Sequence, residues 1–217
     1  MSKIALLPPL VAERIAAGEV IERPASAVKE LVENALDAGA TEVSVALEGG
    51  GKILIEVTDN GRGMDAADLA LCARRHATSK IRALEDLDRL STLGFRGEAL
   101  PSIAAVADLS IASRADGPAD SSAHEIRGER VQAVTFGHFL GSPHGTKVRV
   151  EGLFSQIPAR LKFLRGQGTE VAMVRECLER LAFTRPDAGF LLTSDGRTIL
   201  KLRPQSEAEA QQNQRTA

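Results

Sequence analysis

Residues 23–39 read RPASAVKELVENALDAG, and the rest of the chain is organised around this stretch. Pro24 stands in the first turn, where a missing N–H costs nothing, and Gly39 stands just past the last turn. The stretch therefore predicts a helix whose two ends are both marked. At about 100° per residue, its apolar side chains fall on one stripe: Val28, Leu31, Val32, Ala35 and Leu36.

The opposite arc of this helix collects polar side chains. It carries Glu30, Glu33, Asn34 and Asp37, with Lys29 at its edge. Such an arc is most often a solvated face, and from this helix alone that interpretation is the simpler one. A solvated face normally mixes Lys and Glu at i,i+4 spacing, however, whereas here like charges sit together. A metal ion bound to a phosphate is the kind of cation that would offset them.

Composition excludes several classes of protein. The 217 residues suit one large domain, or a domain plus a fragment of another, and the formal charge of −2 gives no overall field to attract nucleic acid or anionic lipid. Cys72 and Cys177 lie far apart, and the four histidines form no short-range cluster, so we expect reduced thiols and no structural zinc. No apolar run reaches membrane-spanning length, and the N-terminus lacks a signal pattern. These features predict an intracellular protein without a membrane partner.

Periodicity and turn residues predict the other elements. We expect further helices over 10–21, 65–75, 99–107 and 169–184. We expect a hairpin over 42–58, an antiparallel meander over 109–150, and a final hairpin over 190–202 that turns at Asp195-Gly196. Polarity predicts a mobile loop over 76–92, a basic loop or short helix over 154–165, and a disordered end over 206–217.

Two further motifs suggest a nucleotide site. Asp59-Asn60-Gly61-Arg62-Gly63 follows a predicted strand, where a carboxylate can accept from the amine of adenine and glycines let the backbone pass close to a flat ring. Gly94-Phe95-Arg96-Gly97-Glu98 precedes a predicted helix, whose N–H groups and dipole favour a phosphate. Each motif alone is weak, because such turns and loops are common. The sequence has neither a Walker nor a convincing Rossmann motif, so the site would be of another type.

Taken together, the acidic helix, the Asp-x-Gly-x-Gly turn and the glycine loop resemble the GHKL ATPase superfamily of gyrases, heat-shock chaperones, histidine kinases and MutL proteins. Five short sequence motifs narrow the resemblance to the MutL family of DNA mismatch repair proteins: IAAGEV at 15–20, RPASAVKELVENALDAGA at 23–40, RHATSK at 75–80, GFRGEAL at 94–100 and PARLKFL at 158–164. The resemblance runs in order over essentially residues 4–200. On this resemblance, the chain is identified as an N-terminal GHKL ATPase domain of the MutL family.

The resemblance implies roles that suit transfer of a phosphoryl group to water. Glu30 matches the general base that activates the attacking water. Asn34, one turn on, matches the residue that holds Mg²⁺ against the phosphates. Asp59 matches the adenine reader, with Gly61 and Gly63 making room beside it.

Further positions complete the implied ATP site. Residues 78–80 match the nucleotide lid, residues 94–100 match the phosphate loop, and Thr146 matches the hydroxyl that supports Asp59 and the adenine edge. The full set of implied ATP-binding residues is Asn34, Asp37, Ala38, Asp59, Gly61, Gly63, Met64, Thr78, Ser79, Lys80, Leu93, Gly94, Phe95, Arg96, Gly97, Glu98, Ala99, Leu100 and Thr146.

The implied fold class is α+β: a two-layer sandwich of the Bergerat GHKL type, with a mixed, mostly antiparallel sheet covered by helices on one face. We expect one ATPase domain over 1–204. It would include an N-terminal arm and first helix over 1–22 and the ATP lid and phosphate loop over 76–98. Residues 205–217 would be a disordered end or the start of a linker. Without nucleotide, the lid is expected to be mobile.

Two departures from the family pattern stand out. Gln156 occupies a position where the family usually has Asn, which we expect to affect packing rather than nucleotide chemistry. In the family, a lysine from the following domain completes the γ-phosphate site, and we expect that domain and the dimerisation domain to lie beyond this chain. Turnover by this chain is therefore expected to be slow.

Three functions fit these features. The first is a Mg²⁺-dependent ATPase whose cycle gates a repair clamp, and the second is a module that binds ATP with negligible hydrolysis. The third, a histidine-kinase domain, is disfavoured because Glu30 is placed to activate water. The implied partners are ATP, a second copy, a mismatch-recognition protein and other repair factors. DNA would bind weakly, mainly to the full-length dimer, and here through Arg160, Lys162 and Arg165. A bacterial source would imply a cytoplasmic protein that joins the nucleoid during repair.

Overall fold

The computed structural model describes residues 6–79, 97–117, 122–128, 130–135 and 137–205, with side chains omitted for residues 9–13. The strands are β1 Glu42–Glu48, β2 Leu54–Asp59, β3 Asp108–Arg114, β4 Ala123–Arg127, β5 Arg130–Val134, β6 Gly145–Glu151, β7 Gly189–Ser194 and β8 Arg197–Leu202. The helices are α1 Pro9–Val20, α2 Pro24–Asp37, α3 Ala66–Cys72, α4 Ala99–Val106, α5 Pro158–Phe163 and α6 Gln167–Thr184.

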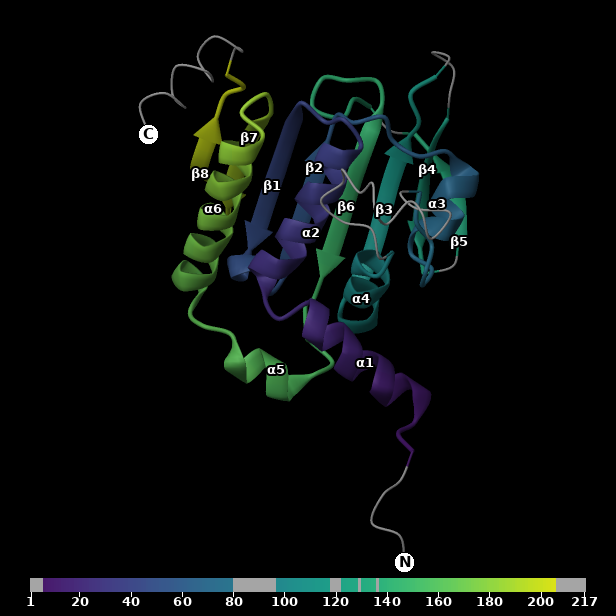
Figure 1. Cartoon of the computed structure of the whole chain (residues 1–217), viewed down its shortest axis with the longest axis vertical. Helices are drawn as coiled ribbons and strands as arrows, with labels where there is room; N and C mark the ends of the chain where they lie inside the picture. The colour runs from purple at the N-terminus through teal and green to yellow at the C-terminus, as the bar shows by residue number, and fades with distance from the viewer. Residues whose placement is uncertain (1–5, 80–96, 118–121, 129, 136, 206–217) are drawn as a thin grey trace, which may run out of the picture.

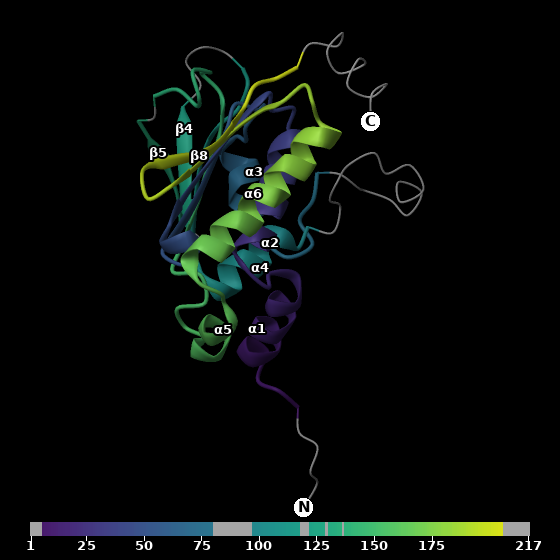
Figure 2. The ribbon, with the colours of Figure 1, turned by 90° about the vertical axis from the view of Figure 1, so that its left-hand side faces the viewer.

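The described strands form one sheet in the order β5-β4-β3-β6-β2-β1-β7-β8. Every pair of neighbours is antiparallel except β1 and β7, which are parallel. The helix layer lies on one side of this sheet: α6, α2 and α4 lie in front of the strands in Figure 1, and the turned view of Figure 2 shows the strands to the left of these helices. The predicted two-layer α+β sandwich with a mixed, mostly antiparallel sheet is confirmed.

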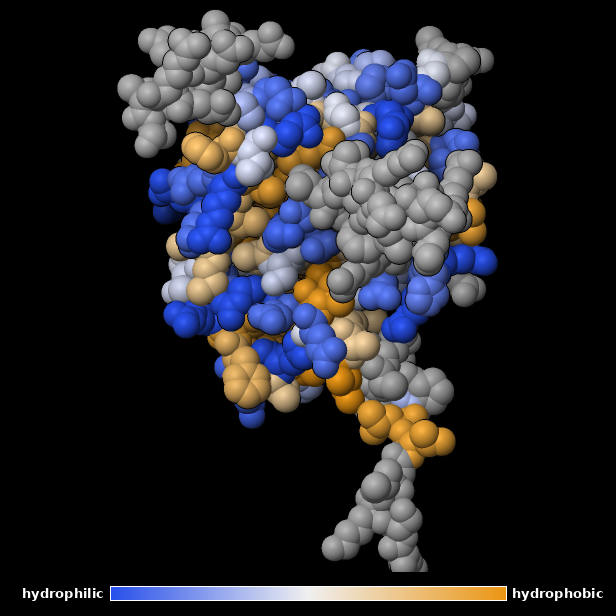
Figure 3. Space-filling model, viewed as in Figure 1, coloured by the Kyte–Doolittle hydropathy of each residue, from blue (hydrophilic) through white to orange (hydrophobic). Residues whose placement is uncertain are grey.

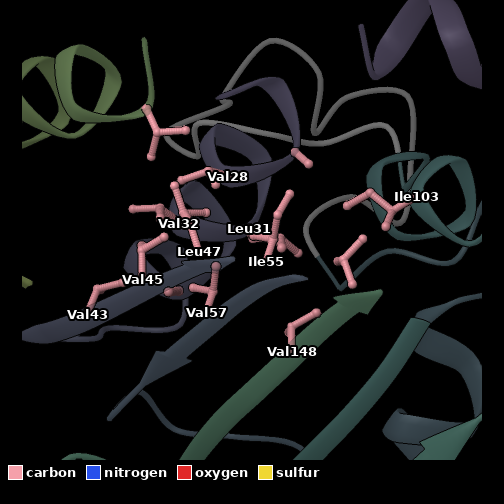
Figure 4. Packing of buried hydrophobic residues seen from close by; sticks show 14 of the residues in the cluster. Val28, Leu31, Val32, Val43, Val45, Leu47, Ile55, Val57, Ile103 and Val148 are labelled. Atoms are coloured by element: carbon pink, nitrogen blue, oxygen red, sulfur yellow. The ribbon is translucent and has the colours of Figure 1, made fainter. Parts of the chain in front are cut away.

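Helix α2 begins and ends where the sequence marks it. Pro24 occupies the first helical position, and Gly39 follows the helix with a φ of 79°, a conformation that glycine adopts without a Cβ penalty. The whole predicted apolar stripe is buried. Figure 4 shows Val28, Leu31 and Val32 pointing at the inward side chains of β1 and β2. This helix therefore forms the centre of the core between the two layers.

The two predicted hairpins are present. Residues 49–51 form a single turn of 3-10 helix between β1 and β2, and all three glycines have positive φ. Asp195 and Gly196 join β7 to β8 with φ values of 48° and 76°, as expected for a two-residue hairpin turn with both central residues left-handed.

The predicted meander over 109–150 holds for β3, β4 and β5 but is wrong for β6. Instead of following β5, β6 pairs with β3 on one side and β2 on the other. Its inward residues explain this central place: Val148 and Val150 join the core, whereas most of β5 is exposed. An edge position would leave that apolar side of β6 without cover.

Helix α1 packs on α4, and two arginines fix it further. Arg14 donates to the side-chain oxygen of Gln156 at 2.5 Å, and Arg160 of α5 donates to the carbonyl of Gly18. Figure 3 shows polar residues over most of the helix-covered face and apolar residues near its lower end. Exposed apolar side chains of this region include Leu6, Leu7 and Phe163.

Some expectations concern residues outside the described ranges. Most of the predicted lid (80–92), the site residues Lys80, Leu93, Gly94, Phe95 and Arg96, and the predicted disordered end over 206–217 lie there.

Candidate active site

The polar arc of α2 faces away from the buried stripe. Glu30, Asn34 and Asp37 are partly exposed on it. Glu33 differs from its neighbours: it is only 6% exposed and lies 2.8 Å from the ammonium of Lys29. That ammonium is also 3.8 Å from a carboxylate oxygen of Glu30, so one lysine offsets two carboxylates. Burial lowers the pKa of Lys29, but the hydrogen bond and charge of Glu33 and the charge of Glu30 outweigh it and raise the pKa.

Helix α6 explains why Glu33 is buried. It packs beside α2, and its Cys177 is close enough to interact electrostatically with both Lys29 and Glu33. Burial raises the pKa of the Cys177 thiol, so the thiol stays neutral there. Glu33 therefore belongs to the contact between α2 and α6. The part of the polar arc that lies away from this contact carries Glu30, Asn34 and Asp37, and it is called the open arc below.

Asp59 ends β2 inside the structure, with only 5% of its surface exposed. One carboxylate oxygen accepts the backbone N–H of Gly61 at 2.9 Å, and the N–H of Thr146 also donates to this carboxylate. Burial raises the pKa of Asp59 to about 6, although these two N–H groups and the electrostatic interaction with His144 lower it. The arrangement pre-positions a buried acceptor for an N–H group of a ligand.

The two glycines after Asp59 allow close backbone approach. A Cβ on Gly61 would lie 3.0 Å from the carbonyl oxygen of Ala38, and the N–H of Arg62 donates to the same carbonyl at 3.0 Å. Gly63 has a φ of 66°, and a Cβ there would lie 1.9 Å from the carbonyl oxygen of Arg114. The first contact places the end of α2 directly against the turn that follows Asp59.

A row of polar residues crosses the sheet beside Asp59. In strand register, Asp59 of β2 lies opposite Thr146 of β6, which lies opposite Ser113 of β3. All three are buried, and they share the face of the sheet that the helices cover, since Val57 and Val148 two residues away join the core. The structure thus brings together Asp59 and Thr146, as the implied site requires.

Ser113 was not among the expected site residues. Its hydroxyl oxygen accepts the N–H of Met64 at 2.8 Å and lies 3.0 Å from the carbonyl oxygen of Gly145 and 2.9 Å from the Thr146 hydroxyl. It therefore connects Met64 to Thr146, two of the implied ATP-binding residues. In the sequence, a serine inside a strand reads as an ordinary core or surface position, and nothing marks it.

His144 is the second residue that the sequence did not single out. Its Nδ1 lies 2.7 Å from the carbonyl oxygen of Gly61, so Nδ1 carries the proton that makes this bond. Its Nε2 lies 3.9 Å from a carboxylate oxygen of Asp116, whose N–H in turn donates to the carbonyl of Arg62. The turn after Asp59 is held by hydrogen bonds on this side too.

The described ranges include only the ends of the implied lid and of the implied phosphate loop. Thr78 and Ser79 lie at the start of the lid, and Gly97, Glu98, Ala99 and Leu100 lead into α4. Gly97 has a φ of 62°, and a Cβ there would lie 2.5 Å from the carbonyl oxygen of Ala77, so the two ends meet. Glu98 precedes α4 and makes no side-chain capping bond within the described ranges, and the first-turn N–H groups of a helix favour an anion. Helices α2 and α4 pack against each other.

The chemistry of the described residues limits the metal that they suit. Within the described ranges, no group of three or more His, Cys, Asp or Glu side chains is placed to hold an ion. The hard oxygens on the open arc of α2 belong to Glu30, Asn34 and Asp37. This set fits Mg²⁺, which commonly takes one or two protein oxygens and binds mainly to substrate phosphates and water. Among the described helices, none combines the length and apolar composition needed to cross a membrane.

The basic segment differs from a simple DNA-binding patch. Arg160 is half-buried: it donates to the carbonyl of Gly18, and its guanidinium lies 5.8 Å from the ring centroid of Phe154. A Cβ on Gly18 would lie only 2.2 Å from this guanidinium. Arg160 is thus used to hold α1 against α5, whereas Lys162 and Arg165 are exposed.

A family model described as "Histidine kinase-, DNA gyrase B-, and HSP90-like ATPase" matches residues 21–135, more than half of the chain. The chain therefore belongs to this ATPase family, and its fold is the GHKL ATPase fold.

Over most of its length, the chain is also similar to proteins named DNA mismatch repair protein MutL. It is 50% identical over 200 residues to that of Pelobacter propionicus, which covers 92% of this chain and 32% of the relative. It is 53% identical over 211 residues to that of Azorhizobium caulinodans, which covers 97% of this chain and 33% of the relative. The chain spans about a third of the length of the curated relatives it matches.

Two solved structures show the same fold. The Aquifex aeolicus MutL ATPase domain complexed with ADP matches with a TM-score of 0.64 and 33% identity, covering 91% of this chain and 70% of that one. The N-terminal domain of a DNA repair protein matches with a TM-score of 0.70 and 28% identity, covering 94% of this chain and 61% of that one. The similarity to MutL proteins that the sequence words indicate is confirmed.

Proposed function

We propose that the chain is the ATP-binding and ATP-hydrolysing domain of a MutL-type DNA mismatch repair protein, and that its nucleotide cycle gates dimerisation and engagement of partners. The observation that carries the proposal is the arrangement of backbone around Asp59. A buried carboxylate, held by two backbone N–H groups, lies between a close-packed glycine turn and the end of the helix that carries Glu30 and Asn34.

The Asp59 carboxylate would accept from the exocyclic amine of adenine. Gly61 and Gly63 approach Ala38 and Arg114 so closely that side chains at these positions would displace the backbone that holds Asp59 in place. Thr146 would support the same edge from the neighbouring strand. These residues would select a base, so they argue for nucleotide binding more directly than the phosphate elements do.

Asn34 and Glu30 would act at the phosphate end. Asn34 would hold Mg²⁺ through its amide oxygen, and the bound ion would neutralise charge on the phosphates. Glu30, one turn earlier on the same face, would orient a water molecule and take its proton. The ammonium of Lys29 lies 3.8 Å from a carboxylate oxygen of Glu30 and places a positive charge beside it.

The phosphates would lie at the N-terminus of α4. Gly97 to Leu100 would supply backbone N–H groups, with Thr78 and Ser79 at the lid base, and the proposal assigns Lys80 and residues 93–96 to the same role. Because α4 also packs against α1, a nucleotide that fixes the start of α4 would fix α1 as well. Through this contact, a bound nucleotide would order the N-terminal arm. The ordered arm would in turn control binding of a second copy, repair factors and DNA.

Release of inorganic phosphate from ATP with Mg²⁺ tests the proposal. We expect slow turnover in the unsubstituted chain, loss of turnover in Glu30→Gln with nucleotide binding retained, and normal turnover in Glu48→Gln, an exposed carboxylate of β1. Tight binding without turnover would leave only a nucleotide-binding module. Transfer of the γ-phosphate to a histidine of a protein would replace the proposal with the histidine-kinase alternative.

A further inference from the structure

We propose that Ser113 is a positioning residue that turns the Thr146 hydroxyl into an obligatory hydrogen-bond acceptor and thereby makes the site prefer adenine over guanine. The inference rests on the proposed function, because it takes Asp59 and Thr146 as the residues that face the base. Ser113 itself touches neither the base nor the phosphates and acts through Thr146.

The hydroxyl of Ser113 is enclosed by three partners. Ser113 is 0% exposed, and its Oγ lies 2.8 Å from the N of Met64, 3.0 Å from the carbonyl oxygen of Gly145 and 2.9 Å from Oγ1 of Thr146. These partners come from the turn after Asp59 and from the start of β6. Ser113 therefore contacts both the turn that follows Asp59 and the start of β6.

Counting protons fixes the direction of each bond. A serine hydroxyl has one proton to donate and two lone pairs to accept with. The N–H of Met64 can only donate and the carbonyl of Gly145 can only accept, so the proton of Ser113 goes to Gly145 and one lone pair goes to Met64. The remaining contact is satisfied only if Thr146 donates its proton to the second lone pair of Ser113. This is the one assignment in which all three contacts are hydrogen bonds.

Because the Thr146 hydroxyl donates its proton to Ser113, it can only accept a hydrogen bond from a ligand. Its oxygen is left with lone pairs only, beside the Asp59 carboxylate, which is also an acceptor when ionised. Adenine carries an amine with two N–H groups at position 6 and satisfies such a pair of acceptors. Guanine carries a carbonyl oxygen there, which would face lone pairs and lose its own solvation. Removal of the Ser113 hydroxyl frees the Thr146 proton to turn toward that oxygen.

Ser110 provides a matched control on the same strand. It is also buried, at 7% exposed, but three residues away along a strand, and therefore on the opposite face of the sheet. Loss of its hydroxyl removes a buried polar atom from β3 without touching the polar row, so Ser110→Ala should leave the ratio of ATP-analogue to GTP-analogue affinity unchanged. A purely structural role for Ser113 predicts that Ser113→Ala also leaves this ratio unchanged.

The test is calorimetric binding of non-hydrolysable ATP and GTP analogues with Mg²⁺ to the unsubstituted chain, Ser113→Ala, Ser110→Ala, Thr146→Val and the double variant Ser113→Ala/Thr146→Val. Ser113→Cys, which keeps the side-chain size but donates and accepts weakly, replaces Ser113→Ala if the latter does not fold. We expect Ser113→Ala to weaken ATP-analogue binding roughly fivefold, the effect of about one neutral hydrogen bond, and to leave or raise GTP-analogue affinity. On the Thr146→Val background, the same substitution is expected to change the ratio of affinities less than about twofold.

Each other outcome overturns the inference. Equal loss of both nucleotides in Ser113→Ala, an unchanged ratio, or an effect that persists in full on the Thr146→Val background would show a structural role only. Failure of the folded, unsubstituted chain to bind either analogue would instead refute the proposed function, and the inference with it.

Discussion

Nucleotide affinity is expected to fall as the pH drops through the pKa of Asp59. The free carboxyl has a pKa raised to about 6 by burial, and its ionised form accepts more strongly from the amine of adenine than the protonated form does. With this pKa, the ionised fraction is about 90% at pH 7 and about 10% at pH 5, so affinity should fall by up to roughly tenfold, or about 1.4 kcal/mol. At pH 6 the carboxyl is half protonated, and binding should release about half a proton per site.

Calorimetry in buffers of different ionisation enthalpy measures this release directly. The nucleotide phosphates also titrate near pH 6, so the comparison is made against Asp59→Asn, which keeps every phosphate contact and removes only the carboxyl. The release attributed to Asp59 is the difference between the two proteins. Equal proton release, or an affinity that does not change between pH 7 and pH 5, would refute the assignment of Asp59 to the base.

The same pKa predicts how stability of the nucleotide-free chain depends on pH. Between pH about 4 and pH about 6, the folded state binds a proton at Asp59 that the unfolded state has released, so stability falls as pH rises through this window. A shift from 3.8 to about 6 corresponds to roughly 3 kcal/mol in full, and no further change follows above pH about 6. Denaturant unfolding from pH 4 to pH 7 should show this fall in the unsubstituted chain and in the exposed control Asp108→Asn, but not in Asp59→Asn.

Two further substitutions, each with a matched control, test the close approach at Gly63 and the attachment of α1 by Arg160. Gly63→Ala places a Cβ 1.9 Å from a backbone oxygen at a φ of 66°, and should cost about 2–4 kcal/mol in denaturant unfolding and abolish nucleotide binding. The control Gly128→Ala has a φ of 60° and open space around it, so it tests backbone strain alone and should lower the free energy of unfolding by about 1 kcal/mol. An equal loss of stability in both variants would contradict the close approach of Gly63 to Arg114. Arg160→Ala removes the bond to Gly18 and should expose the amides of α1 to hydrogen exchange at a cost of about 2 kcal/mol. The exposed Lys162→Ala should change stability by less than about 0.5 kcal/mol, and unchanged exchange in Arg160→Ala would show that α1 is held elsewhere.

Local signals in the sequence account for most elements of the fold. The marked ends and 3.6-residue period of α2, and the Asp-Gly turn of the last hairpin, depend on neighbouring residues only, so the sequence predicts them. The position of β6 depends on which strands it meets, and a two-residue period contains no information about neighbours. Burial of Glu33 has a similar cause, because the helical wheel of α2 cannot show that α6 covers one side of its polar arc.

The candidate site divides in the same way. Asp59 and its glycines stand in one short motif, and their close packing follows from the absence of side chains. Ser113 and His144 contact the turn after Asp59 from other strands or loops, at separations of tens of residues that no local pattern marks. The role of Arg160 is not readable from the sequence either, since a basic residue near Lys162 suggests a charged surface, whereas its half-buried guanidinium packs against Gly18.

Helix α2 and the Asp59 turn are proposed to form one Mg²⁺-nucleotide site. Calorimetric binding of a non-hydrolysable ATP analogue, with and without Mg²⁺, to the unsubstituted chain and to Asn34→Ala tests this directly. We expect binding that depends on Mg²⁺ and that Asn34→Ala removes, while both proteins remain folded. Binding that Asn34→Ala leaves intact, or a folded unsubstituted chain that binds no nucleotide, would contradict this proposal.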